Sequence, residues 1–289
     1  MQGTTISISI ALALAACGPD PRDHGNGGGD GGSGSGDGGQ NGDCAEAAEF
    51  VYTIDQFTNQ LSRFDPATKT FMDLGALSCP TSGGATPFSM SVDRNTVAWV
   101  LYNSGELFRV DILNALACTK TTWNSPNNLK VFGMGFSTDQ AGGSTEALYI
   151  GGGRDQMQTS YTLARVDTTT MTATPIGMQP ALPEMTGTGN AELWGFFPDA
   201  SMPRVVQFDK SLGTVIQTYP QPTLAGTMTG YAFAHWGGDF WVFLLKNGEP
   251  ATTVYQVSGA TGAIVGTTPT SGRTIVGAGV STCAPTVIF

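Results

Sequence analysis

Arg63-Phe64-Asp65 is the first of five similar stretches that decide how this chain folds. The other copies are Arg109-Val110-Asp111, Arg165-Val166-Asp167, Gln207-Phe208-Asp209 and Gln256-Val257-Ser258. Counted on the final Asp or Ser, successive copies lie 46, 56, 42 and 49 residues apart. Each copy ends an alternating apolar run, which is typical of a strand, and leads into a turn-rich segment. This period is that of one four-stranded sheet per repeat, and it predicts an all-β, five-bladed β-propeller.

The two ends of the repeated region predict how the ring closes. The first repeat begins at residues 50–54 with a strand of the second type and lacks an innermost strand of its own. The chain finishes with an unpaired strand of the innermost type at residues 276–282, rich in Gly and Ala. We therefore expect this last strand to pair with the first blade, which removes exposed sheet edges. Six blades are the alternative if residues 151–178 contain additional strands.

Composition limits the domain count and the classes of partner. The chain has 289 residues, with 13 Lys and Arg against 23 Asp and Glu, which gives a net charge of -10. One large β domain accounts for this length. Nucleic acid is not an expected partner, because phosphate binding needs clustered Lys and Arg. The sequence has neither a Cys-x-x-Cys nor an Asp-x-Asp-x-Asp-Gly pattern, so we expect no metal site. We also expect no cofactor, and a monomer.

The N-terminus has the pattern of an export signal. Residues 6–16 form an apolar stretch, too short for a bilayer-spanning helix of about 20 residues but typical of a signal-peptide core. It ends in Leu14-Ala15-Ala16-Cys17, which resembles the lipobox of bacterial lipoproteins. The resemblance implies that residues 1–16 are removed and that Cys17 is lipidated. Residues 1–5 contain no Lys or Arg, which departs from the positive start of signal peptides.

A polar segment separates this signal from the repeats. Residues 18–43 consist mainly of Gly, Ser, Asp and Asn, so they cannot repay the entropy of ordering and we expect them to be disordered. As a Gly-rich coil they would span about 28 Å. Residues 17–43 would thus be a lipidated linker, and residues 44–289 the propeller domain. The expected location is the cell envelope, at the outer membrane on its periplasmic side or at the cell surface.

Four cysteines lie in the repeated region, an even number in a chain that we expect to be exported, which favours disulfides. They are Cys44, Cys79, Cys118 and Cys283, and they allow three pairings. Cys283 follows the orphan inner strand and Cys44 precedes the strand that should pair with it. A Cys44–Cys283 bridge is therefore favoured, and Cys79 would pair with Cys118 by elimination.

The candidate ligand face consists of the loops before innermost strands and between second and third strands. The charged residues that these loops offer are Asp55, Arg154, Asp155, Glu184, Asp199 and Lys246. We assign structural roles to the repeated aspartates, because a carboxylate at a strand end accepts hydrogen bonds from the turn that follows; these are Asp65, Asp111, Asp167 and Asp209. His235, the one histidine of the repeated region, is expected in the core.

No catalytic signature stands out in these loops. From its lipobox through the Gly-rich linker to the Cys283 segment, the chain resembles uncharacterised secreted propeller lipoproteins of predatory or soil bacteria. That resemblance implies location and fold but no activity. We expect a non-enzymatic head that binds a protein or a glycan through its loop face. One alternative is a glycan-cleaving propeller resembling furanosidases, with candidate carboxylates Asp55, Asp155, Glu184 and Asp199. Another, by fold analogy alone, is a scaffold for outer-membrane assembly.

Overall fold

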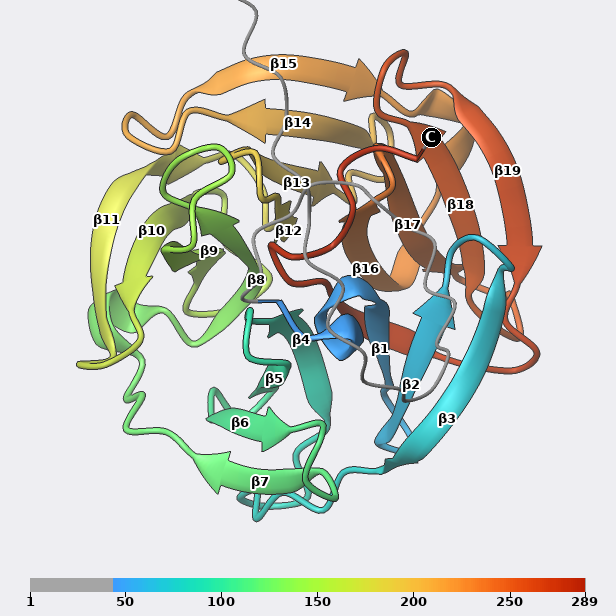
Figure 1. Ribbon diagram of the computed structural model, residues 1–289. Helices are drawn as coiled ribbons and strands as arrows, with labels where there is room; N and C mark the ends of the chain where they lie inside the picture. Colours follow the sequence, from blue (N-terminus) through green and yellow to red (C-terminus); the bar gives the residue numbers. More distant parts are fainter. Residues whose placement is uncertain (1–43, 289) are drawn as a thin grey trace, which may run out of the picture. The chain divides into compact units, whose positions relative to one another are not determined.

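The protein forms a ring of five four-stranded antiparallel sheets (Figure 1). The computed structural model describes residues 44–288. The predicted signal peptide, the lipidated Cys17 and the linker of residues 17–43 lie outside these described residues. Of the helices that the structure describes, none is long and apolar enough to cross a membrane.

The four strands of each blade follow one another outward, from an innermost strand near the axis to an outermost strand at the rim. Blade 1 contains β20 (Ile275–Gly279), β1 (Val51–Asp55), β2 (Gln60–Asp65) and β3 (Thr70–Ala76). Blade 2 contains β4 (Pro87–Val92), β5 (Val97–Tyr102), β6 (Leu107–Asp111) and β7 (Ala117–Lys120). Blade 3 contains β8 (Val131–Thr138), β9 (Glu146–Gly153), β10 (Tyr161–Asp167) and β11 (Thr172–Gln179). Blade 4 contains β12 (Glu184–Gly187), β13 (Leu193–Phe197), β14 (Arg204–Phe208) and β15 (Val215–Pro220). Blade 5 contains β16 (Met228–Trp236), β17 (Asp239–Lys246), β18 (Thr253–Ser258) and β19 (Ile264–Pro269). The connecting segments include the short 3-10 helices η1 (Glu46–Glu49), η2 (Pro126–Asn128) and η3 (Pro222–Leu224).

The ring closes as the sequence predicts, because β20 from the C-terminal end supplies the innermost strand of blade 1. β20 runs antiparallel to β1, with Tyr52 opposite Gly279 and Thr53 opposite Ala278. Gly279 is required by space: an added Cβ would lie 2.8 Å from the carbonyl carbon of Ser91 on the neighbouring inner strand. Small residues on the innermost strands therefore allow the strands to approach one another around the axis.

The blade count is five, so the six-blade alternative is wrong. Residues 151–178 hold no additional strands beyond those of blade 3: they contain the end of β9, all of β10 and most of β11. The spacing of 56 residues between the second and third copies comes instead from longer connections and longer strands within that blade. β9 extends to Gly153, so the loop that the sequence predicts from residue 151 begins at residue 154.

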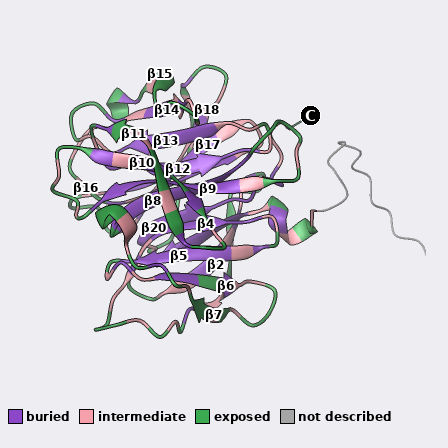
Figure 2. Ribbon diagram, turned by 90° about the vertical axis from the view of Figure 1, so that its left-hand side faces the viewer, coloured by how far each residue is buried: buried purple, intermediate pink, exposed green. Residues whose placement is uncertain are grey.

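The core lies between the blades rather than at the centre of the ring. One apolar cluster packs between each pair of neighbouring blades. Between blades 5 and 1, the ring of Phe64 lies 5.5 Å from the rings of both Trp241 and Phe243. The second strands are consequently buried, while outermost strands such as β15 are exposed to solvent (Figure 2).

The repeated aspartates hold the turns, as expected from the sequence. Asp111 Oδ1 accepts hydrogen bonds from the backbone N–H groups of Leu113 and Asn114. Asp65, Asp167 and Asp209 each accept one or two equivalent bonds from the turn that follows them. The motif that reveals the fold in the sequence is therefore a turn motif and does not form a catalytic set.

Two disulfides are present, with the pairings favoured from the sequence. Cys44–Cys283 joins residues 239 apart, next to the strands that close the ring. Cys79–Cys118 joins the segment before β4 to the outermost strand of blade 2, across 39 residues. His235 is buried as expected, with 7% of its surface exposed.

Replacing Cys44 and Cys283 together by Ser should destabilise the fold more than replacing Cys79 and Cys118. The chain-entropy model gives about 5 kcal/mol for the long loop and about 4 kcal/mol for the short one. Thermal unfolding of the two double variants without reductant measures the difference. A larger loss of Tm in the Cys79→Ser, Cys118→Ser variant would contradict this ordering.

Candidate functional site

The strand order places all six predicted ligand-face residues on one face of the ring, which we call the loop face. This face carries the loops that precede innermost strands and those between second and third strands. Asp55 ends β1, Glu184 begins β12 and Lys246 ends β17, while the other three lie in the connections after β9 and β13: Arg154, Asp155 and Asp199. Within this set, the described contacts join only Arg154 to Asp155, at 2.9 Å. The six residues therefore lie on the same face of the ring but do not converge on one point.

Asp55 braces its own loop. Its Oδ1 accepts hydrogen bonds from Phe57 N, Thr58 N and Thr58 Oγ1, and its Oδ2 accepts one from Thr274 N at 2.6 Å. Burial works to raise the pKa of Asp55, but the bonds from Thr58, Thr274 and Phe57 outweigh it and hold the pKa below its ordinary value. The carboxylate therefore stays ionised and ties β1 to the segment that precedes β20.

Asp155 and Asp199 act in the same way in blades 3 and 4. Asp155 Oδ1 accepts a hydrogen bond from Met157 N, and Asp199 Oδ1 accepts bonds from Ser201 and from Met202 N. The Arg154 guanidinium lowers the pKa of Asp155, and the Ser201 N–H lowers that of Asp199. Both carboxylates are thus used to shape their loops.

These braced loops present large apolar side chains to solvent. Phe57, Met157 and Met202 are 75%, 93% and 68% exposed, and each donates its backbone N–H to the aspartate that starts its loop. Exposed apolar groups of this size mark interaction surfaces when they share a face. We call these three residues the apolar tips of the loop face.

Glu184 differs from the other predicted carboxylates because it is buried. It is 2% exposed, and its Oε2 accepts a hydrogen bond from Ser89 Oγ at 3.0 Å across two innermost strands. Burial raises the pKa of Glu184 well above its ordinary value, and the bond from Ser89 opposes this only in part. Glu184 therefore holds its proton more tightly than an exposed carboxyl does, and it serves as an internal contact between blades 4 and 2.

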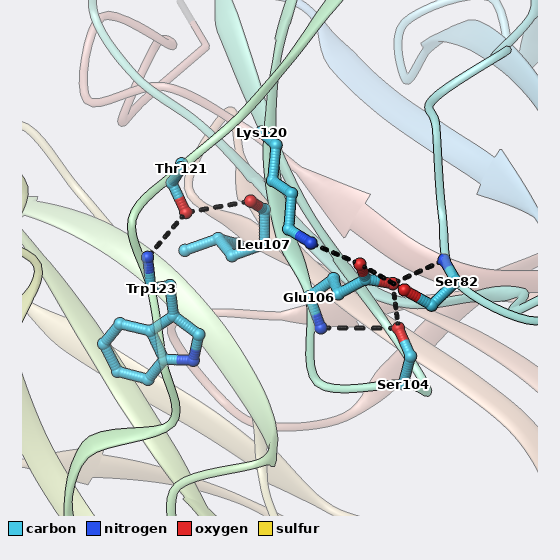
Figure 3. A network of polar contacts seen from close by, with 7 residues as sticks. All are labelled: Ser82, Ser104, Glu106, Leu107, Lys120, Thr121 and Trp123. Carbon is cyan, nitrogen blue, oxygen red and sulfur yellow. Dashed lines mark hydrogen bonds and ion pairs between the residues drawn. The ribbon is translucent and has the colours of Figure 1, made fainter.

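A closed network occupies the corner of the loop face on blade 2 (Figure 3). Glu106 accepts hydrogen bonds from Lys120 Nζ at 2.6 Å, Ser104 Oγ at 2.7 Å and Ser82 N at 2.8 Å. Lys120, followed by the Ser82 and Ser104 bonds, lowers the pKa of Glu106 to about 2. The network fastens the segment before β4 onto the loop between β5 and β6 and onto the outermost strand β7 of its own blade.

The described part of the chain also contains a pocket of about 230 Å³ on the loop face, between blade 1 and the segment that joins β19 to β20. Its wall combines polar residues of three strands of blade 1 with the end of that segment. The lining residues are Thr53, Asp55, Thr58, Gln60, Ser62, Asp73, Ser271, Gly272, Arg273 and Ile275.

The polar groups of this pocket are held in place by one another. Asp73 Oδ1 accepts hydrogen bonds from Ser62 Oγ at 2.7 Å and from Arg273 Nη2 at 2.8 Å. The Arg273 guanidinium also lies over the ring of Phe71, with Cζ 5.0 Å from its centroid. The pocket is therefore preorganised, since its charged groups have fixed partners before any ligand arrives.

Sequence reasoning found Asp55 but missed Ser62, Asp73 and Arg273. A signal was available, because Ser62 interrupts an apolar run that is unbroken in the equivalent strands of the other repeats. The expectation of no metal site was based on sequence motifs alone. Among the described residues, no group of three His, Cys, Asp or Glu side chains is placed to hold a metal ion.

The opposite face, which we call the closure face, carries the first and last of the described residues. Arg94 donates from its backbone N–H to Glu146 Oε1 at 2.8 Å and from Nη1 to Thr282 Oγ1 at 3.1 Å. Thr282 Oγ1 in turn donates to Glu146 Oε2 at 2.6 Å, and Ser281 Oγ donates to Ala48 O at 2.7 Å. Burial raises the pKa of Glu146 to about 7 despite the bonds from Thr282 and Arg94.

Replacing Glu184 or Glu146 by Gln should flatten the pH dependence of stability. A carboxyl with a raised pKa holds its proton more tightly when folded, so its contribution is full below the unfolded pKa of about 4.3. That contribution is lost as pH rises through the folded pKa, which is about 7 for Glu146. Each variant should resemble the natural protein near pH 4 and be more stable than it at about pH 8, as measured by Tm. The same Tm difference at both pH values would refute this.

Comparison with known proteins yields structural likeness only. No protein-family model and no curated protein sequence matches the chain. A protein of unknown function from Bacteroides caccae is similar in structure, with a TM-score of 0.45, 8% identity, and coverage of 80% of this chain and 97% of that one. Regucalcin, a calcium-binding protein from Agrobacterium tumefaciens, has a TM-score of 0.46 and 14% identity, covering 82% of this chain and 75% of that one. Hydrazine synthase of Kuenenia stuttgartiensis has a TM-score of 0.41 and 14% identity, and the match covers 74% of this chain and 61% of that one. The strand order makes the described chain a five-bladed β-propeller, and its likeness to these proteins assigns no activity.

Proposed function

We propose that this protein is a lipid-anchored protein of the cell envelope whose propeller head binds an external ligand, a protein or a glycan, through the loop face. The observation that carries the proposal is the polar pocket, which lies on the loop face. Exposed apolar side chains occur on both faces, since Leu113 and Leu212 in closure-face turns are 63% and 64% exposed, so the three apolar tips add contact area but do not distinguish the faces. The closure face holds the disulfide and hydrogen bonds that join the first and last described segments.

The attachment point of the preceding chain lies away from the loop face. Cys44, the first described residue, is on the closure face, bonded to Cys283 and in contact with Arg94. A linker of the composition of residues 17–43 spans about 28 Å, which would give the head room to turn.

The bonding of the carboxylates favours binding over glycan cleavage. An inverting glycosidase needs an acid and a base about 6.5–9.5 Å apart, one of them with a raised pKa. Asp55, Asp155 and Asp199 are committed to their own loops and their pKa values are lowered. Glu184 has a raised pKa but is buried between innermost strands.

Loop-face variants should lose the ligand while variants elsewhere keep it. The mature chain with Cys17→Ser would be applied to a glycan array and used as bait in envelope extract. One variant changes the apolar tips Phe57, Met157 and Met202 to Ser, and a second changes Arg273 to Ala in the pocket. The matched control changes three similarly exposed residues outside the loop face to Ser: Leu113, Leu212 and Val265, which are 63%, 64% and 57% exposed.

At least one loop-face variant should reduce binding about tenfold or more, as expected when an anchor contact is removed, with the control unchanged. A ligand that is lost only by the control variant would contradict the proposal. So would the absence of any ligand in both assays.

Cys17 should carry the anchor. In a host that processes lipoproteins, the natural chain should incorporate labelled palmitate and remain with the membrane fraction. Stable attachment to a membrane needs two acyl signals, so retention in this fraction reports full lipidation. Cys17→Ser should abolish the label and release the protein. Cys79→Ser with Cys118→Ser, which also removes sulfur atoms, should keep the label. Labelling that survives Cys17→Ser would disprove the anchor.

A further inference from the structure

The five blades allow the same position to be compared five times within one chain. In blade 1, Thr53, Ser62 and Asp73 lie directly opposite one another across β1, β2 and β3. The register places Val100, Ile150, Gly195 and Val242 at the position of Thr53 in the other blades. It places Phe108, Ala164, Val206 and Tyr255 at the position of Ser62. Among the described blades, blade 1 therefore has hydroxyl groups at both positions, whereas the other four have apolar residues there apart from Tyr255 of blade 5.

Blade 1 also differs from the other blades at the next position on the same side of the second strand, which is closer to the loop face. Asp55 occupies the position that Tyr102, Gly152, Phe197 and Leu244 hold in the other blades, two residues further along the same strand. In blade 2 this region is packed shut, because Val100, Tyr102 and Phe108 are at most 2% exposed and belong to the apolar cluster with blade 1. In blade 1 the apolar cluster with blade 5 includes Val51, Phe64 and Ile275 but neither Thr53 nor Ser62. The pocket borders this cluster, since Ile275 belongs to both.

This polar row lowers the stability of the fold. Apolar residues at these positions contribute burial energy in the other interfaces, whereas buried hydroxyl and carboxylate groups need hydrogen-bond partners. One buried polar atom of a lining residue, Arg273 Nε, has no hydrogen-bond partner among the described residues. The polar row therefore costs stability in the fold, and a binding role would account for that cost.

The charges of the wall select among ligands. Two carboxylates, of Asp55 and Asp73, face a single guanidinium, of Arg273, so an anion would meet net repulsion. Among the described contacts, Asp73 Oδ1 accepts the hydrogen bonds from both Ser62 and Arg273. Its Oδ2 therefore remains available as an acceptor for a ligand. Ser271 and Gln60 add further uncharged polar groups. Such a wall suits a neutral molecule with several hydroxyl groups that both donate and accept.

The pocket is small. Its volume of about 230 Å³ is below that of the usual site for a drug-sized compound. A single six-membered ring with its hydroxyl groups matches this size.

We propose that the pocket between blade 1 and the segment that joins β19 to β20 binds one neutral sugar residue. Asp73 and Gln60 would bind its hydroxyl groups, the buried Thr53 and Ser62 form the polar floor that positions Asp73, and Arg273 closes one side. The inference rests on the proposed function and narrows its ligand to a glycan. It makes blade 1 the specificity-determining blade of a ring that is otherwise a repeated scaffold.

The substitutions in this test copy the residues that other blades of the protein have at the same positions. Thr53→Val copies blades 2 and 5, and Ser62→Ala copies blade 3. The double variant should therefore fold with a Tm no lower than that of the natural protein. The matched control, Thr162→Val, makes the same kind of change on β10, outside the pocket. The probes are the methyl glycosides of neutral hexoses and N-acetylhexosamines, with methyl glucuronide as an anionic comparison.

Binding to the mature chain with Cys17→Ser would be measured by saturation-transfer NMR and titration. At least one neutral glycoside should bind, methyl glucuronide should not, and the double variant should bind at least about tenfold more weakly, as the loss of the hydrogen bond that positions Asp73 implies. Thr162→Val should bind as the natural protein does.

Three results would overturn the inference: no neutral glycoside binds, the double variant binds as well as the natural protein, or only the glucuronide binds. One of these results could occur together with capture of an envelope protein by the natural chain but not by the apolar-tip variant. In that case the sugar pocket is wrong and the proposed loop-face function stands. If neither assay yields a ligand, both fail together.

Discussion

The antiparallel pairing of β20 with β1 is the contact on which the rest of the structure depends. Without it blade 1 would lack its innermost strand, and the row of small residues around the axis would be incomplete. Each apolar cluster joins two neighbouring blades, so an open ring would expose one side of blade 1 and one side of blade 5. The Cys44–Cys283 disulfide and the Ser281–Ala48 hydrogen bond reinforce this junction on the closure face.

Closure also creates the candidate site. The pocket wall takes Thr53, Ser62 and Asp73 from the first three strands of the chain, and Ser271 and Arg273 from the segment just before the last strand. Asp55 links the two parts through its bond from Thr274 N. The pocket is thus found at the one blade interface that is formed by both ends of the chain. Ordinary blades are connected by local turns, and their interfaces are filled with apolar side chains.

Much of the fold was accessible from the sequence, because its signals are local. The Asp65-type turns mark each repeat, alternation marks the strands, and the orphan segment before Cys283 predicts how the ring closes. The site was less accessible. Asp155 and Asp199 look like free loop charges in the sequence, yet each is bonded to its own loop. Arg273 and Asp73 are 200 residues apart and meet only because the ring closes. Comparing Ser62 with its four counterparts would have indicated the unusual blade, although not the residues across from it.

A wall assembled from distant parts of one polypeptide also makes the pocket a property of the whole ring. Asp73 and Arg273 meet across 200 residues of sequence, so a fragment that holds one of them lacks the other. The complete cavity can therefore form only when β20 docks against β1, in the same step that completes blade 1.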